Sequence, residues 1–557
     1  RIYRKIKSQP VGFGFPVARS VLRDTKNLIA VDEKGSVIPC FFKILNDWQD
    51  GSIQWVFADT LVDFEENQAR WIKIKTSKTK KVKLPENPVA IINEGTKIII
   101  KNGIIKLVLD SAAGSLIELF EVQGEKFIKT NGFDINFVYS GKVFSLKKGE
   151  KKISVEHNNP CRAVIRIDGK HSSEDNQQFL DYYIRFEIYA GKSEVKITYG
   201  FRNKEPYVPG ISINDFYAVI NTNLNKKTQK GFASLCWGRF YEKKFIKTNK
   251  EVEIIASDTG DIDHWIDTHK ENGIGEVFIR DASILQDSPE EKPWFIKNPE
   301  FRFVAGGNKT VFPYVYLMDD KKGILGFFED MRFLHPKSIY VNENIIKFGI
   351  WPGWAGKLDI TQGAGRSHSM FLCPVFPGMS DFDIQTKFLS MEIEGIPSAG
   401  GSPVDISIDP GYVSTCNVFA IDKLPAFDWE KHFLFERKII DCWLELEYGT
   451  YDRVKSYPAT GFWNYGDNGY NNEEMFALQY LQNYFRTGNW SCARVGITGA
   501  RHIMEVDHIV FSTDPYQNLG MAAHCCHHND GASYPSHMWF TELLFAYVIT
   551  GDIEFKK

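Results

Sequence analysis

The histidines of this chain are concentrated near its end, and that stretch offers the most chemistry. The segment "MAAHCCHHNDGASYPSHMW", residues 521–539, holds His524, His527, His528 and His537. Only 13 histidines occur among the 557 residues, so the density is unusual. Imidazole titrates near neutral pH and also binds metals, so this segment could serve proton transfer or metal binding.

Metal binding is the first alternative for this segment. His524 and His528 have the i, i+4 spacing of a helical zinc motif, in which a glutamate stands between the two histidines. Here Cys525, Cys526 and His527 fill the gap instead. The Asn-Asp-Gly that follows favours a loop over a helix. We therefore expect no metal at these histidines, and Ca²⁺ is the one cofactor that the sequence leaves open.

Proton transfer is the second alternative, and His537 is its strongest candidate. The run "YPSHMWFTELL" predicts a helix that Ser536 caps and that His537 begins. The positive end of a helix dipole favours neutral imidazole, which can accept a proton. The alternative interpretation is an exposed histidine at a helix start with no chemical role.

A second pair of histidines lies just upstream, in "GARHIMEVDHIVFS". Read as one continuous helix, this segment places Arg501, Glu505 and His508 on one face. His502 then lies on another face, so both histidines can reach one substrate atom only if the helix ends near Asp507. We expect one of the two histidines to be structural.

A third candidate segment is "FWNYGDNGYNNEEMF". A loop from Asn464 to Tyr470 leads into a predicted helix with Asn472 as its cap and with Glu473 and Glu474 in its first turn. Capping and the helix dipole fully explain these three polar residues. A functional role for them therefore depends on where the loop lies relative to the histidine segment.

The elements that position these residues change in kind along the chain. The first 430 or so residues predict β-structure, with runs such as "WIKIKT", "TKIIIKNGIIKLVLD", "RAVIRIDG" and "FEIYAGKSEVKITYGF" between polar turns. Near residue 85, "KLPENPVAI" is expected to join a small β domain to a larger one. A large β-sandwich is the natural container for so many strands.

After the connector "GIPSAGGSPVDISIDPGY" the hydrophobic period shifts towards 3.6. We predict helices over "DWEKHFLFERKIIDCWLELEYGTYD", "NEEMFALQYLQNYFRTGN" and "HMWFTELLFAYVITGD". The last two end alike, with Gly488 and Gly551 where a left-handed cap residue is wanted. Such a helical repeat is typical of a toroid or solenoid. The helical part is short for a closed toroid, so we expect the chain to be truncated, cleaved or completed elsewhere.

Length and composition limit the number of domains and the classes of partner that the protein can have. A chain of 557 residues exceeds the size of one core, about 250–300 residues, and three domains are expected. The net charge of −3 offers no basic field for nucleic acid or an anionic membrane. No run of about 18 apolar residues predicts a membrane span, and the start lacks a signal core, so we favour a cytoplasmic over a secreted location. Nine cysteines without CxxC spacing argue against a disulfide framework.

Taken together, the motifs resemble the exo-rhamnogalacturonan lyase family of polysaccharide lyases, which includes the YetA-like proteins. The resemblance begins at "PVGFGFPVARSVLRD" and at "DWQDGSIQWVFAD", with its W-x-D-G-S-x-x-W signature, and continues through "WPGWAGKLDITQGAGRSHSMFL" to the helical segments quoted above. It implies a multidomain β plus α fold. The expected domains are a small N-terminal β-barrel over residues 1–85, a central β-sandwich over 86–425 and the first part of an α/α toroid catalytic domain over 426–557.

The resemblance also implies an activity, cleavage of a uronic-acid-containing, rhamnogalacturonan-like polysaccharide or oligosaccharide by β-elimination. The uronate carboxylate must be neutralised, a base removes the C5 proton, and an acid protonates the leaving O4. Arg501 would neutralise the carboxylate and Tyr534 would be the acid. His537 or His508 would be the base. The expected substrate-binding residues are Asn472, Glu473, His502, His528, His524, Tyr465 and Trp539.

Two rival functions stay open at this stage. One is a glycoside hydrolase of the α/α toroid class, which would need two carboxyl groups about 5–9.5 Å apart, for which Glu473 and Asp507 are the candidates. The other is a carbohydrate-binding protein without catalysis. The high aromatic content of 14% suits sugar stacking, although core packing explains most of these rings. In all three cases the expected partner is a carbohydrate, and the sequence leaves the oligomeric state open.

Overall fold

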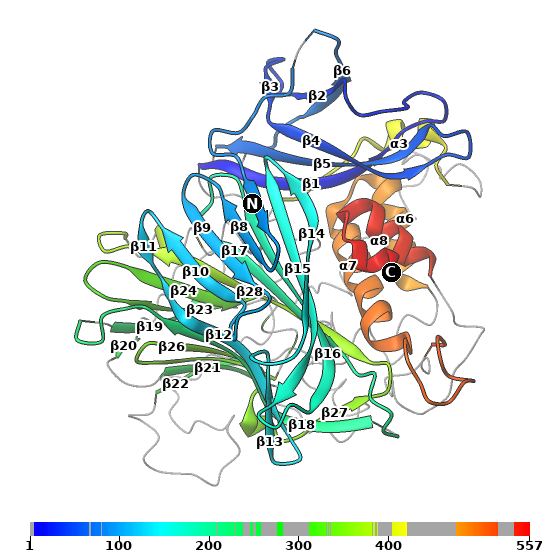
Figure 1. Ribbon diagram of the computed structural model, residues 1–557. Helices are drawn as coiled ribbons and strands as arrows, with labels where there is room; N and C mark the ends of the chain where they lie inside the picture. The colour runs from blue at the N-terminus through cyan, green and yellow to red at the C-terminus, as the bar shows by residue number, and fades with distance from the viewer. Residues whose placement is uncertain are drawn as a thin grey trace.

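In the computed structural model the protein is mostly β, with few helices among the described residues (Figure 1). The structure describes residues 5–65, 68–79, 81–208, 210–228, 230–237, 246–248, 252–257, 276–281, 311–329, 331, 334, 336–380, 383–384, 387, 404–419, 475–521 and 540–557. The helix expected over residues 428–452 lies outside these ranges. In the parts of the chain that are described, no helix has the length and hydropathy needed to cross a bilayer.

The N-terminal strands form two three-stranded antiparallel sheets. The first has the order β1-β5-β4 and the second β3-β2-β6. Their shared core includes Phe15, Leu28, Cys40 and Val56. The described strands pair into two separate sheets, so the small β-barrel expected over residues 1–85 stays a prediction. The strands are β1 (Ile6–Pro16), β2 (Leu28–Val31), β3 (Val37–Ile38), β4 (Cys40–Asp47), β5 (Ile53–Phe64) and β6 (Lys73–Thr76).

The W-x-D-G-S-x-x-W signature has a structural explanation in this domain. The Trp48 indole N–H donates a hydrogen bond to a backbone carbonyl beyond β1 at 3.0 Å. The Asp50 carboxylate accepts one from the Ser20 hydroxyl at 2.7 Å. Trp55 is buried and its ring centroid lies 5.4 Å from that of Phe485. These contacts close a loop and join the domain to a helix, so the signature needs no catalytic role.

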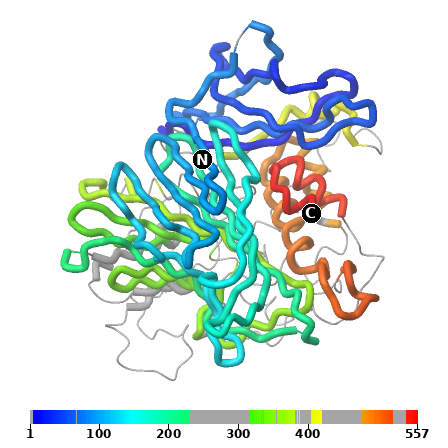
Figure 2. Tube along the Cα trace, in the orientation of Figure 1, coloured from blue at the N-terminus to red at the C-terminus, as the bar shows by residue number. Residues whose placement is uncertain are grey.

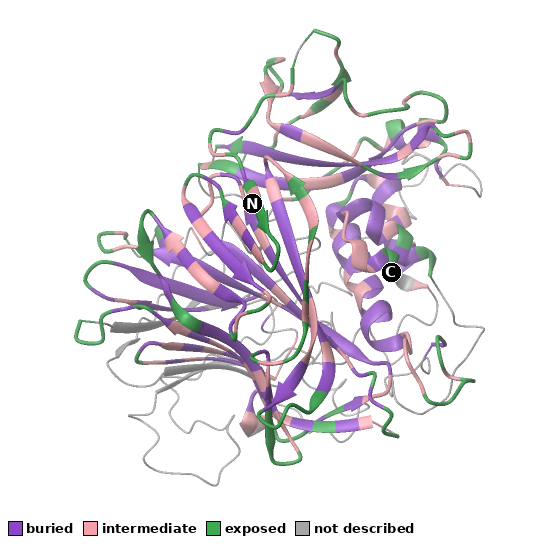
Figure 3. Cartoon of the chain, viewed as in Figure 1, coloured by how far each residue is buried: buried purple, intermediate pink, exposed green. Residues whose placement is uncertain are grey.

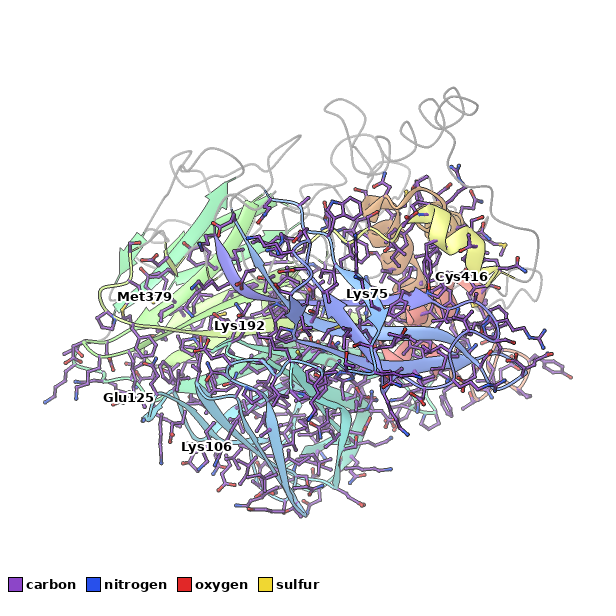
Figure 4. The ribbon with its side chains drawn as sticks, turned by 90° about the horizontal axis from the view of Figure 1, so that it is seen from above. Lys75, Lys106, Glu125, Lys192, Met379 and Cys416 are labelled. Carbon is purple, nitrogen blue, oxygen red and sulfur yellow. The ribbon has the colours of Figure 1, made fainter. Side chains whose placement is uncertain are left out.

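A five-stranded antiparallel meander follows, in the order β11-β10-β9-β8-β7. The predicted run "TKIIIKNGIIKLVLD" forms its central hairpin, and Gly103 takes a φ of +79° at the turn, which suits glycine. Figure 4, seen from above, shows Lys106 and Glu125 of this sheet on the side of the molecule away from Cys416. The strands are β7 (Ala90–Glu94), β8 (Lys97–Lys101), β9 (Ile105–Asp110), β10 (Ile117–Val122) and β11 (Glu125–Lys126).

The central body is a β-sandwich whose 17 described strands connect into one large, nearly closed barrel-like sheet. Strand β13 pairs with both β12 and β15 and thereby joins the two layers. One layer runs β14 (Lys151–Asn159), β15 (Arg162–Ser173), β16 (Gln178–Tyr189), β17 (Val195–Arg202), β28 (Gly365–Val375), β24 (Gly323–Phe328), β23 (Val311–Met318), β19 (Lys230–Trp237) and β20 (Ile246–Thr248). The other runs β13 (Lys142–Ser145), β12 (Ile128–Tyr139), β18 (Gly210–Thr222), β26 (Ile345–Trp351), β25 (Lys337–Asn342), β21 (Val252–Ser257) and β22 (Glu276–Asp281), and β27 (Leu358–Thr361) also pairs with β18.

The sandwich interior is apolar and strongly aromatic, and Figure 3 shows long buried stretches along its strands. Phe137 lies at its centre, stacked on Phe144 at 5.6 Å and edge-on to Phe216 at 5.4 Å between ring centroids. His171 is fully buried beside Phe137, with one ring nitrogen 2.9 Å from a backbone carbonyl and the other 3.2 Å from the Tyr199 hydroxyl. Burial lowers the pKa of His171 to about 4, so this histidine is a neutral core residue.

The described helices lie beside the sandwich and below the N-terminal sheets (Figures 1 and 2). As predicted, Gly488 and Gly551 end two of them in the left-handed conformation, with φ of 72° and 67°. The toroid implied by the resemblance is not confirmed by these helices. They are α3 (Pro410–Cys416), α6 (Phe476–Thr487), α7 (Trp490–His502), the π-helix η4 (Ile503–Asp507), α8 (Thr541–Thr550) and the 3₁₀ helix η6 (Ile553–Lys556), while a short 3₁₀ turn, η1 (Gly353–Ala355), lies in the sandwich.

The N-terminal domain packs directly on helix α8. A Cβ atom added at Gly14 would meet the backbone carbonyl oxygen of Val548 at 1.5 Å, so only glycine allows this approach. Phe57 of β5 lies against Gly551 at the end of the same helix. The helices therefore lie between two β domains, and one core cluster contains side chains from both the N-terminal sheet and the helices.

Candidate functional site

The described candidate residues gather where helix α7 ends against the sandwich. The α-helix stops at His502 and continues as the π-helix η4 to Asp507, after which His508 is extended, with φ −79° and ψ 114°. The His508 N–H donates to the carbonyl of Ile503 at 2.8 Å, a five-residue span that closes the π-turn. The helix therefore ends at Asp507, which is the condition stated above for both histidines to reach one substrate atom. Turns of this type occur often at functional sites.

His502 and Asp507 form a buried pair. Their Nε2 and Oδ1 atoms lie 3.2 Å apart, and their side chains are 0% and 2% exposed. Such burial does not fit the predicted contact of His502 with substrate, and it withdraws Asp507 from the carboxyl pair expected of a hydrolase. His502 is therefore the structural member of the two upstream histidines.

Arg501 already has anionic partners within the protein. Its guanidinium lies 3.1 Å from an Asp552 carboxylate oxygen and 3.7 Å from one of Glu505, the i, i+4 neighbour that the helical pattern placed on its face. The guanidinium also lies 5.1 Å from the ring centroid of Phe555. A positive charge shared between two carboxylates is poorly suited to neutralising a third on a substrate, so the contacts of Arg501 do not fit that predicted role.

Glu505 anchors the π-turn to the edge of strand β28. Its carboxylate accepts hydrogen bonds from the Ser367 backbone N–H at 3.1 Å and from the Ser367 hydroxyl, and Arg366 lies 3.5 Å away. The Glu505 side chain is 3% exposed. A buried carboxylate needs such partners, so this residue fixes the helix end to the sandwich.

Arg202 of strand β17 holds the same turn by its backbone. Its guanidinium donates to the carbonyl oxygens of Glu505 at 2.7 Å and of Met504 at 3.2 Å. It also donates to the carbonyl of Gly363, in the loop before β28, at 3.2 Å. The last carbonyls of a helix lack partners within the helix, and here a side chain from another domain supplies them. Sequence reasoning missed Arg202, because nothing local marks it.

His508, like Arg501 a predicted catalytic residue, is partly accessible. Its ring lies edge-on to Phe540, with centroids 5.4 Å apart, and its backbone forms a β-bridge with Met521. Burial lowers the pKa of His508, the Arg202 charge lowers it further, and a hydrogen bond with the backbone of Leu519 opposes them. The imidazole is therefore neutral at pH 7 and can accept a proton.

A network of buried charges continues from this point along the outer face of the sandwich. Arg185 lies 2.8 Å from Asp552 and 2.7 Å from Glu156, and Arg166 lies 2.6 Å from Glu554. These five residues, which we call the seam, join strands β14 to β16 to the chain after α8. In the sequence, the seam is marked only by the alternation of charged with apolar residues in β15 and β16. On its own, this alternation indicates a strand face that is exposed to solvent.

The start of helix α8 corrects another prediction. The helix begins at Thr541, and Phe540 before it has φ −121° and ψ −9°, so α8 starts four residues later than predicted, and His537 itself lies outside the described residues. Phe540 instead packs its ring on His508, a tertiary contact outside the scope of a local pattern. The other predicted site residues, which lie outside the described residues, are His537, Tyr534, His524, His527, His528, Trp539, Asn472, Glu473 and Tyr465.

Metal binding is the other chemistry that the sequence raised, and the described residues offer no site for it. In the part of the chain that the structure describes, no group of three or more His, Cys, Asp or Glu side chains is arranged to hold an ion. The histidine-rich segment falls outside that part of the chain, so the expectation of no metal at these histidines, with Ca²⁺ as the one possible cofactor, stays a prediction. Five cysteines are buried free thiols: Cys40, Cys161, Cys373, Cys416 and Cys492.

Comparison with known proteins identifies the central domain. Residues 89–213 match the family described as PcRGLX-like protein central beta sandwich domain, which is related to rhamnogalacturonan lyases. The match covers less than a quarter of the chain. No curated protein matches the sequence.

Solved structures offer only distant likeness. An α-mannosidase from Enterococcus faecalis V583 is 10% identical, with 70% of this chain and 44% of that one covered and a TM-score of 0.35. A putative aldose 1-epimerase from Escherichia coli K12 is 9% identical, with 52% and 99% covered and a TM-score of 0.25. The chain thus spans less than half of the mannosidase, and scores this low carry no functional argument.

Proposed function

We propose that the protein is a polysaccharide lyase that cleaves a uronic-acid-containing, rhamnogalacturonan-like polysaccharide or oligosaccharide by β-elimination. The observation that carries the proposal is the match of residues 89–213 to the central sandwich of PcRGLX-like proteins. That sandwich is the part of the molecule against which the candidate site is built. In this proposal the catalytic domain is the helical one, over residues 426–557, and the expected toroid belongs to the proposal.

The chemistry of β-elimination gives His508 a role. The C5 proton of a uronate becomes removable once the adjacent carboxylate is neutralised, and a neutral imidazole can then take it. The lowered pKa of His508 and its partial exposure support it as the base. His537 remains the alternative base and Tyr534 the acid, as the resemblance implies.

The group that neutralises the carboxylate is the open role in this scheme. Arg501 is engaged by Asp552 and Glu505, so we do not retain it for that step. Asn472 and His528, two of the substrate-binding residues that the resemblance implies, are the candidates that we propose in its place. An amide or a neutral imidazole can donate a hydrogen bond to a carboxylate, although neither supplies a full charge.

A direct assay tests this function. The protein is incubated with rhamnogalacturonan and with a panel of other uronate polymers, with and without a chelator, and the ultraviolet absorbance of a 4,5-unsaturated uronate is followed. We expect His508→Gln or His537→Gln, and Tyr534→Phe, to lower kcat by about 10²–10⁴-fold. If His537→Ala and Tyr534→Phe both keep full turnover, their assignments are wrong.

The same assay separates the two rival functions. A hydrolase releases reducing ends without unsaturated product, and the burial of Asp507 against His502 argues against its part in such a site. A binding protein retains pectic oligosaccharides at every pH without turnover. Either result would replace the lyase proposal.

A further inference from the structure

We propose that Arg202 of the sandwich is a positioning residue for His508, holding the π-turn that carries His508 and maintaining its imidazole in the proton-accepting form. This inference rests on the proposed function where it concerns catalysis. The control that Arg202 exerts over His508 can be measured without any substrate. This role of Arg202 makes the sandwich a direct part of the site, in addition to a support for the helices.

The first argument is the shape of the contact. Arg202 contacts two successive carbonyls of the π-turn, those of Met504 and Glu505, and a third carbonyl from Gly363. A planar guanidinium offers five N–H donors in a fixed geometry, whereas a lysine ammonium is a single point. Only arginine can therefore satisfy these three acceptors at once from one position on strand β17.

The second argument is that the sandwich holds the chain on both sides of His508. Before it, Arg202 and Ser367 hold the backbone and the side chain of Glu505. After it, Gly363 packs so closely that an added Cβ would lie 2.9 Å from the backbone nitrogen of Val510. Gly363 also has a φ of +79°, which favours glycine.

The loop next to Gly363 extends this second contact. The side-chain oxygen of Gln362 accepts a hydrogen bond from the Thr513 N–H at 3.1 Å and lies 3.3 Å from the Ser512 hydroxyl. Residues 509–513 are thus tied to the loop before β28, as residues 504–505 are tied to β17. With His508 between these two attachments, its position depends on the register of β17 against β28, where Arg202 pairs with Gly365.

The third argument is electrostatic. Among the described neighbours of the His508 ring, Arg202 supplies the charge from the sandwich, and Phe540 on the α8 side is uncharged. The backbone of Leu519 forms a hydrogen bond with the His508 ring, and this bond favours the protonated ring. The Glu505 carboxylate, three residues before His508, is bound by Ser367 and Arg366. A fixed positive charge opposes protonation of a nearby imidazole, so Arg202 favours the form that a base needs.

The experiment compares Arg202→Gln, which loses both the charge and the geometry, with Arg202→Lys, which keeps the charge. Arg166→Gln is the matched control, because Arg166 lies on the same face of the sandwich but pairs with Glu554. The first readout is the rate at which diethyl pyrocarbonate modifies His508, followed by mass spectrometry of its peptide across pH. This reagent attacks neutral imidazole and needs no substrate. The second readout is kcat and KM for cleavage of the uronate polymer.

We expect the modification of His508 at about pH 6 to be about threefold slower in Arg202→Gln, because more of its imidazole is protonated. Arg202→Lys and Arg166→Gln should keep the wild-type pH profile. In the assay, Arg202→Lys should lower kcat about tenfold with little change in KM, because the base is displaced while substrate contacts remain.

The two readouts separate this inference from the proposed function. An unchanged His508 profile in a folded Arg202→Gln protein overturns the inference, and so does wild-type kcat in Arg202→Lys. If Arg202→Gln does not fold, the kcat of Arg202→Lys decides alone. If the wild type cleaves no uronate polymer yet the His508 profile shifts in Arg202→Gln, the proposed function fails while the control of His508 by Arg202 stands.

Discussion

The two faces of strands β15 and β16 build two different environments. On the inner face Ile165 and Ile184 are fully buried in an apolar core. On the outer face the side chains of Arg166 and Arg185 are almost as well buried, at 10% and 9% exposed, but their neighbours are carboxylates. Alternate residues of the same two strands thus pack in an apolar core on one face and among buried charges on the other.

The difference teaches what each face can specify. Apolar contacts are non-directional, so the interior tolerates rearrangement as long as its volume is filled. A buried ion pair is costly unless every partner is present. The seam is therefore satisfied only when the chain after α8 lies in one position against the sandwich. We infer, as a hypothesis, that the interior supplies most of the stability and that the seam sets the position of the helices.

The largest expected effect breaks the interior. Phe137→Ala removes a fully buried ring that contacts Phe144, Phe216 and His171, and should cost about 3–5 kcal/mol in the free energy of unfolding. Chemical denaturation measures this loss. Val143→Ala is the control, because Val143 is 55% exposed on a neighbouring strand and its truncation should change stability by less than about 0.5 kcal/mol. Similar losses in both variants would contradict a packed interior here.

The next effect breaks the seam. Arg185→Met removes one of the arginine partners of both Glu156 and Asp552 and should cost about 3 kcal/mol at neutral pH. A second change, Asp552→Asn, should recover part of this loss, because it removes the charge of a buried carboxylate that has lost its Arg185 partner. Full additivity of the two changes would show that the pair is not coupled.

The pH dependence of the seam follows from Asp552. Burial would raise the pKa of this carboxyl, but Arg185 and Arg501 together hold it well below its usual range. The stability that this group contributes is therefore present above its unfolded pKa, about 4, and is lost as pH falls through the lower folded value. The deficit of Arg185→Met should shrink below about pH 4.

A smaller effect concerns a buried carboxyl outside the seam. Glu542 in helix α8 is fully buried, and neither of its carboxyl oxygens has a hydrogen-bond partner in the structure. Burial raises its pKa to about 7. The folded state thus binds the proton more tightly than the unfolded state, so stability falls as pH rises from about 4.5 to 7. Glu542→Gln should gain about 2–3 kcal/mol over wild type between about pH 4.5 and pH 8. Parallel pH curves would disprove the raised pKa.

The smallest effect comes from an exposed ion pair of the same chemical type. Lys226 and Glu343 lie 2.7 Å apart, but their side chains are 62% and 66% exposed. Lys226→Met should cost less than about 1 kcal/mol, and the loss should decrease further in about 1 M NaCl. A loss equal to that of Arg185→Met would show that burial does not distinguish the two pairs.

The local structure could be predicted from the sequence to a useful extent. "RAVIRIDG" forms part of β15, "FEIYAGKSEVKITYGF" forms the end of β16 and most of β17, and "GAGRSHSMFLCPVF" contains β28. The caps at Gly488 and Gly551 were also predicted. These features depend on neighbours within a few residues, so periodicity and turn chemistry can report them. The match of residues 89–213 agrees in part with the family that the motifs resembled.

The candidate site was predicted less well. Arg501, His502 and Asp507 lie near one helix end, and each is held by partners within the protein. The described helix begins at Thr541 rather than at His537, and Phe540 before it contacts the His508 ring. A pattern identifies which residue types lie close along the chain, but it does not reveal which of them tertiary contacts will bury.

What the sequence by itself determined is the set of strands, the turns and the two helix ends, because these arise from local propensity and alternation. Only the tertiary structure decided that a charged strand face would be buried, that α7 would end in a π-turn, and that Arg202 would bind a carbonyl 303 residues away. The reason is physical. An unpaired helix carbonyl and a buried charge each need a partner, and the topology of the sandwich determines which distant residue comes within reach.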